Sequence, residues 1–414
     1  MDARVEAGMF DAVIVGGGPA GSTAAILLAQ AGWSVALVEK SAFPRRKVCG
    51  ECISATNLPL LHALGIGAAF EAMAGPQIRE VALFAGKAVL TAPLPPFGDP
   101  RHPWGRALGR EHLDSLLLAR AAEAGATILQ PCAIKRIARE GAVHRCDGVD
   151  ANGETIALRA RVTIAAHGSW EPDPSWQETR LPHRASDLFA CKATYRDTRL
   201  VPGLLPVLAF PGGYGGIVLG DHDRTTLAFC IRRDALRESR RRHSPRNAAL
   251  AALAHVRTHC AGVRDALEGA EADAPWLSVG PIQPGIRRPW RADGMFAVGN
   301  VAGEAHPILG EGMSMAIQSA WLLCERLIAG SDALLAGDAS ERARVAVGAD
   351  YAAAWRRSFI PRIRLAAVLA HLAMRPRASG VLLPLLRRWP WLLTSGARAG
   401  GKVSDLAIRK GRTA

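Results

Sequence analysis

The stretch DAVIVGGGPAGSTAAILLAQAGWSVALVE, residues 11–39 of 414, decides the fold of this chain. Its apolar start at 11–15 predicts a buried strand, 22–31 predicts an apolar helix, and 35–38 predicts a second strand. Three glycines at the spacing Gly-x-Gly-x-x-Gly separate the first strand from the helix. The order of strand, glycine loop, helix and strand is that of a βαβ unit with parallel strands, which predicts an α/β fold.

Each part of this unit suits a dinucleotide. Gly16 allows a tight turn, Gly18 lets the backbone approach a pyrophosphate, and Gly21 lets the helix pack closely on the strand. The helix N-terminus presents free N–H groups to phosphates, and Glu39, 18 residues after Gly21, is placed to accept hydrogen bonds from a ribose. We predict a Rossmann-like domain that binds FAD or NAD(P), a choice that this motif leaves open. The residues predicted to contact the dinucleotide here are Gly16, Gly18, Pro19, Ala20, Gly21, Glu39 and Lys40.

A second glycine-rich segment begins at residue 299, which is 283 positions after Gly16. The sequence GNVAGEAHP and, three residues later, GEGM lie between a short strand predicted at 295–298 and an apolar helix predicted at 314–328. This segment resembles the second motif of the flavoprotein family that contains aromatic-ring hydroxylases (class A monooxygenases), geranylgeranyl reductases and tryptophan halogenases. In that family Gly-Asp-Ala-Ala, a proline and Gly-x-Gly lead into a helix whose N-terminus faces the flavin, so the resemblance implies FAD. Asn300 replaces the usual Asp and can still accept a hydrogen bond from the ribityl chain. The residues that the resemblance assigns to FAD here are Gly299, Asn300, Gly310, Glu311, Gly312 and Met313.

Two further segments resemble FAD contacts of the family. RRKVCGE at 45–51 is similar to a Lys-x-Cys-Gly-Glu loop of the geranylgeranyl reductase-like branch, where the loop runs under the flavin. The resemblance adds Lys47, Cys49 and Gly50 to the FAD contacts. Arg110, at the start of a predicted amphipathic helix, corresponds to a family arginine near the phosphates.

Several polar residues near the implied flavin leave alternatives open. Cys49 and Cys52 form either a redox-active dithiol or a flavin-contacting loop with an incidental second cysteine. No second ligand pair lies nearby at metal spacing, so no metal site is expected. His306 and Pro307 are the candidate catalytic residues, with His306 either a general acid or base or a positioning group. His167 replaces a family acid, which puts direct binding of NAD(P)H in doubt.

Between the two glycine motifs, alternating segments predict an antiparallel sheet. They resemble the substrate domain inserted in this family, and the Trp-x-Trp-x-Ile-Pro pattern of its halogenases is absent. After the second motif, 339–374 predicts a long helix broken at Pro361, and the Leu-, Trp- and Arg-rich segment 381–393 predicts either a membrane-surface element or a helical cap. The predicted strands are 189–195, 205–210, 213–219 and 225–231. The predicted domains are a discontinuous FAD-binding domain (1–75, 100–180 and 275–335), a substrate domain (76–99 and 181–274), and a C-terminal helical, basic region (336–414).

Composition limits the compartment and the partners. The chain has 51 Lys and Arg against 37 Asp and Glu, and from Trp355 onward 13 basic residues accompany a single acid, Asp405. This basic end is either a solvated tail or a peripheral membrane contact over 355–414, and no nucleic-acid-binding motif accompanies it. Eight unevenly spaced cysteines, no signal peptide and no apolar run of 18 residues predict a cytoplasmic protein, at the inner membrane face if the basic end binds lipid.

The resemblance implies an FAD-dependent oxidoreductase with a lipophilic small-molecule substrate. The leading prediction is a monooxygenase that hydroxylates an aromatic, polyketide-like or lipophilic substrate through a C4a-hydroperoxyflavin. Two alternatives stay open: a geranylgeranyl reductase-like enzyme that reduces double bonds of lipids or isoprenoids, and a non-catalytic flavin-binding protein at a membrane. The expected reductant is NAD(P)H or a reduced-flavin or ferredoxin donor.

Overall fold

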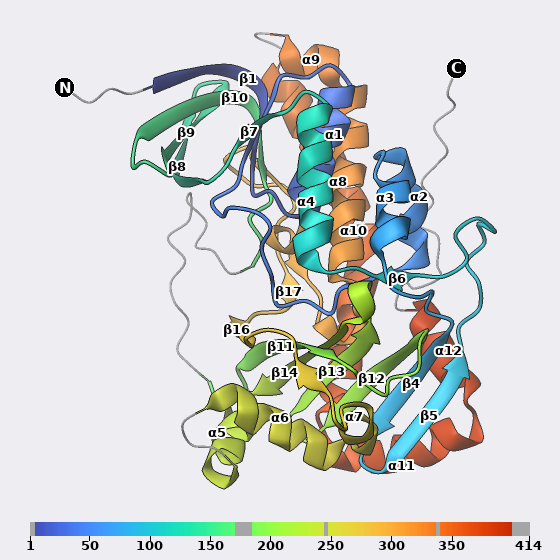
Figure 1. The fold of residues 1–414 in the computed structure, drawn as a ribbon. Coiled ribbons are helices and arrows are strands. Elements are labelled where there is room, and N and C mark those ends of the chain that lie inside the picture. The colour runs from blue at the N-terminus through green and yellow to red at the C-terminus, as the bar shows by residue number, and fades with distance from the viewer. Residues whose placement is uncertain (1–4, 170–183, 244–246, 337–339, 400–414) are drawn as a thin grey trace.

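Two β-sheets lie one above the other along the length of the molecule, and helices pack against both (Figure 1). The computed structural model describes residues 5–169, 184–243, 247–336 and 340–399. The first sheet and its helices contain both glycine-rich loops, and the second sheet lies below them in Figure 1. The space between the two sheets is therefore bounded by segments that are distant in the sequence.

The first sheet has the strand order β7-β2-β1-β10-β9-β8, with β18 also paired to β10. The strands β7, β2, β1, β10 and β18 are parallel, and β9 and β8 complete the sheet as antiparallel neighbours. The pairs Ile14 with Leu37 and Ile164 with Phe296 bring the beginning, middle and late parts of the chain into register. The strand predicted at 35–38 is found there, and the strand predicted at 11–15 begins earlier. The bounds are β1 (Val5–Val15), β2 (Val35–Val38), β7 (Thr127–Leu129), β8 (Cys132–Glu140), β9 (Val143–Asp150), β10 (Thr155–Ala165) and β18 (Phe296–Ala297).

Three helices run side by side against this sheet (Figure 1). The middle one, α1, is apolar nearly all round because it lies between β-strands and two other helices. Its residues Ala24, Ala25 and Leu28 are fully buried in one core with Leu117 and Leu323 of the neighbouring helices. The bounds are α1 (Pro19–Gln30), α4 (Arg110–Glu123) and α8 (Gly312–Ala329).

The second sheet has the order β15-β11-β14-β13-β12-β4-β5, with β16 also paired to β11. It is antiparallel except where β12 runs parallel to β4. The four strands predicted in the middle of the chain are all present within one residue of their expected bounds. The bounds are β4 (Glu80–Ala85), β5 (Ala88–Pro93), β11 (Leu188–Arg196), β12 (Leu204–Phe210), β13 (Gly213–Leu219), β14 (Thr225–Arg232), β15 (Glu271–Ala272) and β16 (Leu277–Ile282).

Both faces of the second sheet are covered. On one face Phe84, Leu227 and Val256 belong to a core shared with α6 and α7, and α5 packs beside α6. On the other face Tyr214 and Ala370 belong to a core that includes the long helix over residues 340–373. The bounds are α5 (Arg233–Arg242), α6 (Ala248–His259) and α7 (Ala261–Ala266).

The long C-terminal helix α10 (Ser340–Ala373) passes through Pro361 without ending, so the break predicted there is wrong. A mid-helix proline costs about 3 kcal/mol. Trp355, Phe359 and Ile363 lie on both sides of it and are buried in the core of the first sheet's helices, which offsets that cost. The segment predicted at 381–393 forms α11 (Pro376–Arg388) and α12 (Trp391–Ala399), which contact β5.

Short elements connect these layers. Among the described residues, every helix falls short of the length and hydropathy that a bilayer span requires. The remaining bounds are β3 (Cys52–Ile53), η1 (Ala55–Asn57), α2 (Leu58–Ala63), α3 (Gly67–Met73), β6 (Arg106–Ala107), η2 (Asp221–Asp223), β17 (Gly285–Ile286), η3 (Gly299–Val301), β19 (Gly303–Glu304), η4 (Pro307–Leu309) and α9 (Ser331–Leu335).

Candidate active site

The first glycine loop joins β1 to α1, and its glycines differ in what the protein itself requires of them. Gly16 has φ +112°, and a Cβ there would lie 2.5 Å from the Ala166 carbonyl oxygen. A Cβ on Gly21 would lie 1.8 Å from the Gly16 carbonyl oxygen. Around Gly18, by contrast, the closest protein atom to such a Cβ is 3.7 Å away, on Arg110. Gly16 and Gly21 therefore serve backbone packing, whereas the bare backbone at Gly18 leaves room beside the loop for a ligand.

Glu39, at the end of β2, closes this loop from the side. Its carboxylate accepts hydrogen bonds from the Gly17 N–H at 2.8 Å and from the Ser41 N–H at 2.9 Å, and it pairs with Arg45 at 3.2 Å. The side chain is almost fully buried yet borders the cavity described below. A buried carboxylate at this position is the acceptor that ribose hydroxyls require.

Arg110 supplies a fixed positive charge next to Gly18. It lies in the first turn of α4 and donates to both oxygens of Asp114, at 2.7 Å each. Burial opposes its charge, but the Asp114 carboxylate outweighs burial and raises the pKa of Arg110 above its usual value. A buried guanidinium held by a bidentate pair is suited to a phosphate group nearby.

The second loop approaches the first from the other side. Gly299 has φ +60°, its N–H donates to the Ser319 hydroxyl at 2.8 Å, and a Cβ there would lie 3.2 Å from Ala20 of α1. The Asn300 amide donates to the Ser169 hydroxyl at 3.2 Å. Gly310 takes the left-handed conformation just before α8 begins at Gly312, so the N-terminus of that helix is directed at the same region.

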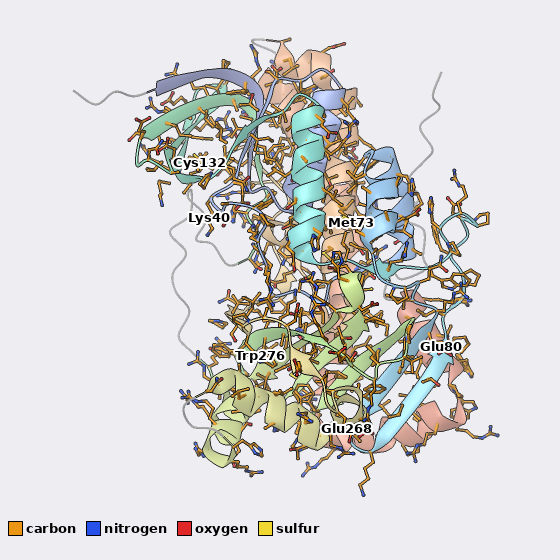
Figure 2. All side chains as sticks on the ribbon, in the orientation of Figure 1. Lys40, Met73, Glu80, Cys132, Glu268 and Trp276 are labelled. Carbon is orange, nitrogen blue, oxygen red and sulfur yellow. The ribbon has the colours of Figure 1, made fainter. Side chains whose placement is uncertain are left out.

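The two loops border one cavity of about 840 Å³. It extends from the first sheet to the second and to the C-terminal helices, and its walls are mainly apolar. Figure 2 labels Lys40 and Cys132, two of its lining residues, on the side of the first sheet, and Trp276 and Glu268 with the second sheet. The predicted site residues that line it are Gly16, Gly18, Pro19, Ala20, Glu39, Lys40, Lys47, Cys49, Gly50, Arg110, Gly299, Asn300, Pro307, Gly310, Gly312 and Met313.

Three predicted site residues lie behind the cavity wall. Gly21 packs against Gly16, and Glu311 accepts a hydrogen bond from the buried Ser54 hydroxyl. His306 reaches the cavity only through Tyr214, with 2.9 Å between its Nδ1 and the tyrosine hydroxyl. These three residues shape the site rather than lining it.

Tyr214 lines the cavity, and its hydroxyl is paired with His306 behind the wall, so this pair is one group near the cavity that could hold a proton. Burial, with a smaller contribution from nearby His371, lowers the pKa of His306 to about 4. Burial also raises the pKa of Tyr214 well above its usual value. Both groups are therefore neutral at pH 7. Tyr214 was not predicted as a site residue; the only sequence signal for it is one aromatic residue within a run of glycines on a predicted strand.

A second group missed by the sequence analysis anchors the Lys47–Glu51 loop. Glu51 is buried with φ +60°, pairs with the fully buried Lys192 of β11, and accepts from the Thr226 hydroxyl of β14 at 2.6 Å. It also accepts from the Arg110 N–H at 3.0 Å. One carboxylate thus joins the loop, the start of α4 and the second sheet. The only sequence signal for this pair was a lysine, Lys192, within a predicted strand.

All eight cysteines are free thiols, including Cys49 and Cys52. The Cys49 sulfur accepts from the Glu51 N–H at 3.4 Å, and its proximity to Arg110 contributes to the raised pKa of that guanidinium. Both cysteines border the cavity. Whether they cycle as a dithiol stays a prediction.

The fold and the cavity define an FAD-dependent oxidoreductase, and comparisons with known proteins support this class. The family described as "FAD binding domain" matches residues 9–190. Digeranylgeranylglycerophospholipid reductase 2 of Methanopyrus kandleri is 30% identical over 345 residues, which cover 77% of this chain and 75% of that protein. The 6-methylpretetramide 4-monooxygenase of Streptomyces rimosus is 27% identical over 345 residues, covering 77% and 76%. The chain belongs to the family of FAD-binding oxidoreductases that includes these two enzymes.

Solved structures agree on the fold. A flavin-dependent brominase superposes with a TM-score of 0.73 at 19% identity, over 95% of this chain and 94% of that one. A geranylgeranyl bacteriochlorophyll reductase-like protein of Thermoplasma acidophilum superposes with a TM-score of 0.66 at 17% identity, over 94% and 99%. The same fold therefore carries both oxidation and reduction chemistry, and the reaction must be argued from the site.

Proposed function

We propose that this protein is an FAD-dependent monooxygenase that hydroxylates a lipophilic substrate in the cavity between its two sheets. The observation that carries the proposal is that the wall of this cavity is mainly apolar. Leucines and alanines of the second sheet and of α10, α11 and α12 face the two glycine loops across it. An apolar, shielded space beside a flavin is what oxygen transfer to an apolar substrate requires.

The chain's residues divide this task. The first loop, Glu39 and Arg110 would hold the ADP half of FAD, and the second loop with the N-terminus of α8 would hold the ring. FAD, when bound and reduced, supplies the electrons that activate oxygen or reduce a substrate. Apolar residues such as Leu83, Leu372 and Leu383 exclude water and bind the substrate, and the neutral Tyr214–His306 pair can donate or accept one proton.

A second candidate function is reduction of a carbon–carbon double bond in an isoprenoid lipid. The specific observation in its favour is the Lys47–Glu51 loop, which borders the cavity with Cys49 and is anchored by Lys192. The Methanopyrus reductase at 30% identity adds weight. Reduction needs a proton as well as a hydride, and Tyr214, whose hydroxyl is paired with His306, is a residue of the cavity lining.

One assay separates the two reactions. The FAD-loaded protein is reduced chemically, so that the natural donor is irrelevant, and mixed with a digeranylgeranyl lipid in detergent or with a polycyclic phenol. Under ¹⁸O₂ a monooxygenase gives a product that contains one ¹⁸O atom. A product with two added hydrogens, formed without oxygen, establishes the reductase instead. If neither product forms, mass spectrometry of ligands that co-purify identifies further substrates, and failure with those as well contradicts both proposals.

The cavity wall itself can be tested on α11. Leu383 lines the cavity, whereas Val381 of the same helix is 66% exposed. Leu383→Trp should fill the substrate space and lower kcat/KM at least about tenfold, a barrier increase of about 1.4 kcal/mol, without loss of FAD. Val381→Trp is the matched control and should leave kcat/KM unchanged.

We also propose that α11 and α12 touch a membrane surface. Trp389 and Trp391 are 44% and 61% exposed and lie beside exposed Arg387 and Arg388, while Leu386 of the same segment lines the cavity. Exposed tryptophan beside arginine is the composition of a membrane-interface segment. Residues 400–414 of the basic end lie outside the described residues.

The membrane proposal is tested by sedimentation with vesicles. Vesicles with anionic phospholipid should bind the protein more strongly than neutral vesicles, and replacing both tryptophans with alanine should reduce binding. Val201→Ala, at a 57% exposed apolar position between β11 and β12, is the control. Equal binding by all variants contradicts the proposal.

The electron donor is a further proposal. His167 borders the cavity where the family usually has an acid, which favours a reduced-flavin or ferredoxin donor over direct binding of NAD(P)H. Anaerobic mixing with NADH or NADPH should then leave the flavin oxidised, whereas a ferredoxin or a flavin reductase should bleach it. Rapid bleaching by NADPH alone would reverse this assignment.

A further inference from the structure

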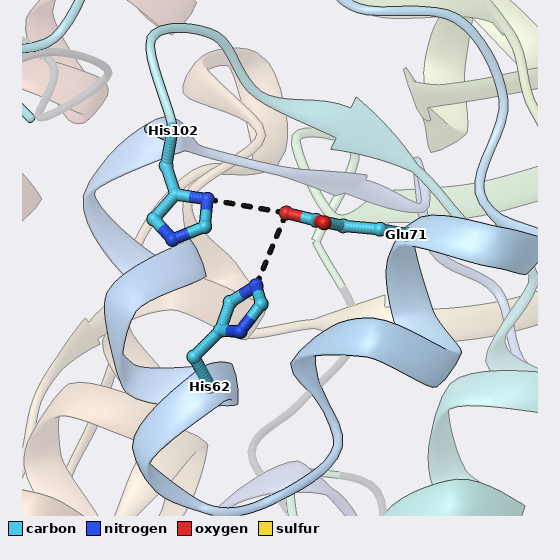
Figure 3. A group of neighbouring side chains, drawn as sticks. All are labelled: His62, Glu71 and His102. Atoms are coloured by element: carbon cyan, nitrogen blue, oxygen red, sulfur yellow. Dashed lines mark hydrogen bonds and ion pairs between the residues drawn. The ribbon is translucent and has the colours of Figure 1, made fainter. Parts of the chain in front are cut away.

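Away from the cavity, two helices and a loop bring together His62, Glu71 and His102 (Figure 3). His62 is on α2, Glu71 is on α3, and His102 is on the loop that precedes β6. His62 Nε2 and His102 Nδ1 each lie 3.1 Å from the same oxygen, Glu71 Oε1. None of these three residues borders the cavity.

These distances suit a shared metal ion. Zinc bonds to histidine nitrogen and carboxylate oxygen are about 2.0–2.1 Å, so the ligand atoms of a tetrahedral site lie about 3.3 Å apart. The two nitrogen–oxygen distances of 3.1 Å are close to that edge length. All three ligand atoms lie within 4.8 Å of one another.

His102 is the buried member of the cluster. His102 is 8% exposed, and its Nδ1 makes no hydrogen bond of acceptable geometry although a carboxylate oxygen is 3.1 Å away. A buried ring nitrogen normally has a hydrogen-bond partner. This nitrogen and the Nε2 of His62 therefore approach the same carboxylate oxygen from two sides (Figure 3), an arrangement that can also hold a shared cation.

The surroundings hold the cluster in place. Gly67 lies against the His62 ring, where a Cβ would be 2.3 Å from the imidazole, so any other residue would displace the ring. Arg106 donates to the Glu71 carbonyl oxygen at 2.8 Å and to two neighbouring carbonyls, which fixes the end of α3. The rings of His62 and His102 stack with centroids 4.4 Å apart.

A second His/Asp group in the protein shows the contrast. His112, Asp221 and His222 are also close together, but the Asp221 carboxylate is already held by the Arg224 guanidinium and by the Gly109 N–H at 2.7 Å. Among the described residues, no Lys or Arg pairs with the Glu71 carboxylate. A cation can therefore join the first group without displacing an arginine.

We propose that His62, Glu71 and His102 form a binding site for a zinc-class divalent cation. Two imidazoles and one carboxylate leave the fourth position to water and suit zinc or its first-row neighbours. The ion would tie α2 and α3 to the loop before β6. The sequence predicted no metal site because the three residues are separated by 9 and 31 positions and converge only in the folded chain.

The test uses the untagged, FAD-loaded protein, because a histidine tag would itself bind the probe. Zinc chloride is titrated by calorimetry, and bound zinc is counted after gel filtration. One zinc per chain is expected, with a rise in Tm. His102→Ala and Glu71→Gln should each weaken binding at least about tenfold and remove the rise in Tm. Flavin content and the Tm without zinc show that each variant is folded, and His112→Ala is the matched control that should bind as the parent does.

X-ray absorption at the zinc edge identifies the ligands. Nitrogen and oxygen at about 2.0–2.1 Å support the site, whereas sulfur at about 2.3 Å would assign the ion to a cysteine instead. The proposal is overturned if zinc fails to bind stoichiometrically, which would leave a hydrogen-bonded cluster only, or if it binds equally to His102→Ala and Glu71→Gln.

Discussion

At the scale of single residues, experiment can separate the roles of Gly18 and Gly21, the second and third glycines of the first loop's motif. Gly21→Ala places a methyl group 1.8 Å from the Gly16 oxygen and should destabilise the fold by about 2–3 kcal/mol. Gly18→Ala meets no protein atom closer than 3.7 Å and should leave the apoprotein nearly as stable as the parent while weakening FAD binding. Denaturant unfolding of the apoprotein and a flavin titration measure the two effects. Equal loss of stability in both variants would mean that Gly18 also serves packing.

The Glu51–Lys192 pair gives a second prediction. Lys192→Met leaves a buried carboxylate without its cation and should cost about 3–5 kcal/mol of unfolding free energy. The double variant Lys192→Met with Glu51→Gln should recover most of that loss, because no unpaired charge remains. Urea denaturation of the three proteins measures the coupling. If the double variant loses as much unfolding free energy as the two single variants added together, the two side chains do not form a buried, coupled pair.

His306 makes stability depend on pH in a defined window. Its pKa is lowered to about 4 in the folded chain, against about 6.5 in the unfolded chain. The unfolded chain therefore binds the extra proton first as pH falls, and the contribution of His306 to stability is complete above pH 6.5 and lost between about 6.5 and 4. Allowing for partial exposure, the loss is about 2 kcal/mol. His306→Gln should lose less stability than the parent between pH 7 and 5, and identical pH profiles would contradict the burial argument.

At the residue scale, sequence predicts position best where a motif fixes the backbone. Glycine spacing placed Gly16, Gly18 and Glu39 around one loop, because the turn and the helix start leave little freedom. Tyr214 and Lys192 could not be predicted, because their roles depend on side-chain partners supplied by distant strands. Whether the cavity-lining residues bind FAD as predicted awaits the flavin titration.

At the scale of elements, Pro361 is where the low helix propensity of proline wrongly predicted a break in α10. The residue is exposed, while its neighbours in α10 are anchored in the core. Pro361→Ala should restore the missing hydrogen bond and stabilise the protein by about 2 kcal/mol, measured by thermal or urea unfolding. Arg364→Ala, on the same exposed face, is the control and should change stability by less than about 0.5 kcal/mol. A destabilised Pro361→Ala would show that the proline has a packing role.

Element prediction succeeded for strands and buried helices with clear periodicity, such as β2 and β11 to β14. It failed to anticipate how α10 overrides its proline, because tertiary burial is not visible in a local window. The pairing of β4 with β12 across more than a hundred residues was likewise beyond sequence pattern.

At the scale of the whole molecule, the cofactor cavity joins segments from residue 15 to residue 397. Removing FAD should therefore lower the stability of the entire chain rather than of one lobe. A free FAD concentration 100 times the Kd stabilises the folded state by about 2.7 kcal/mol. Thermal unfolding of stripped and reloaded protein should show one shifted transition, and a shift confined to one of two separate transitions would contradict it.

The strand order of the first sheet has a consequence for synthesis on the ribosome. β1 leaves the exit tunnel first, but its neighbour β10 follows some 140 residues later, and β18 is made only when more than two thirds of the chain exists. β2 can pair with β1 as soon as it emerges, but the other edge of β1 stays unpaired until β10 is made, so folding should be slow and chaperone contact prolonged. A nascent chain stalled before residue 296 should remain protease-sensitive, whatever the supply of flavin.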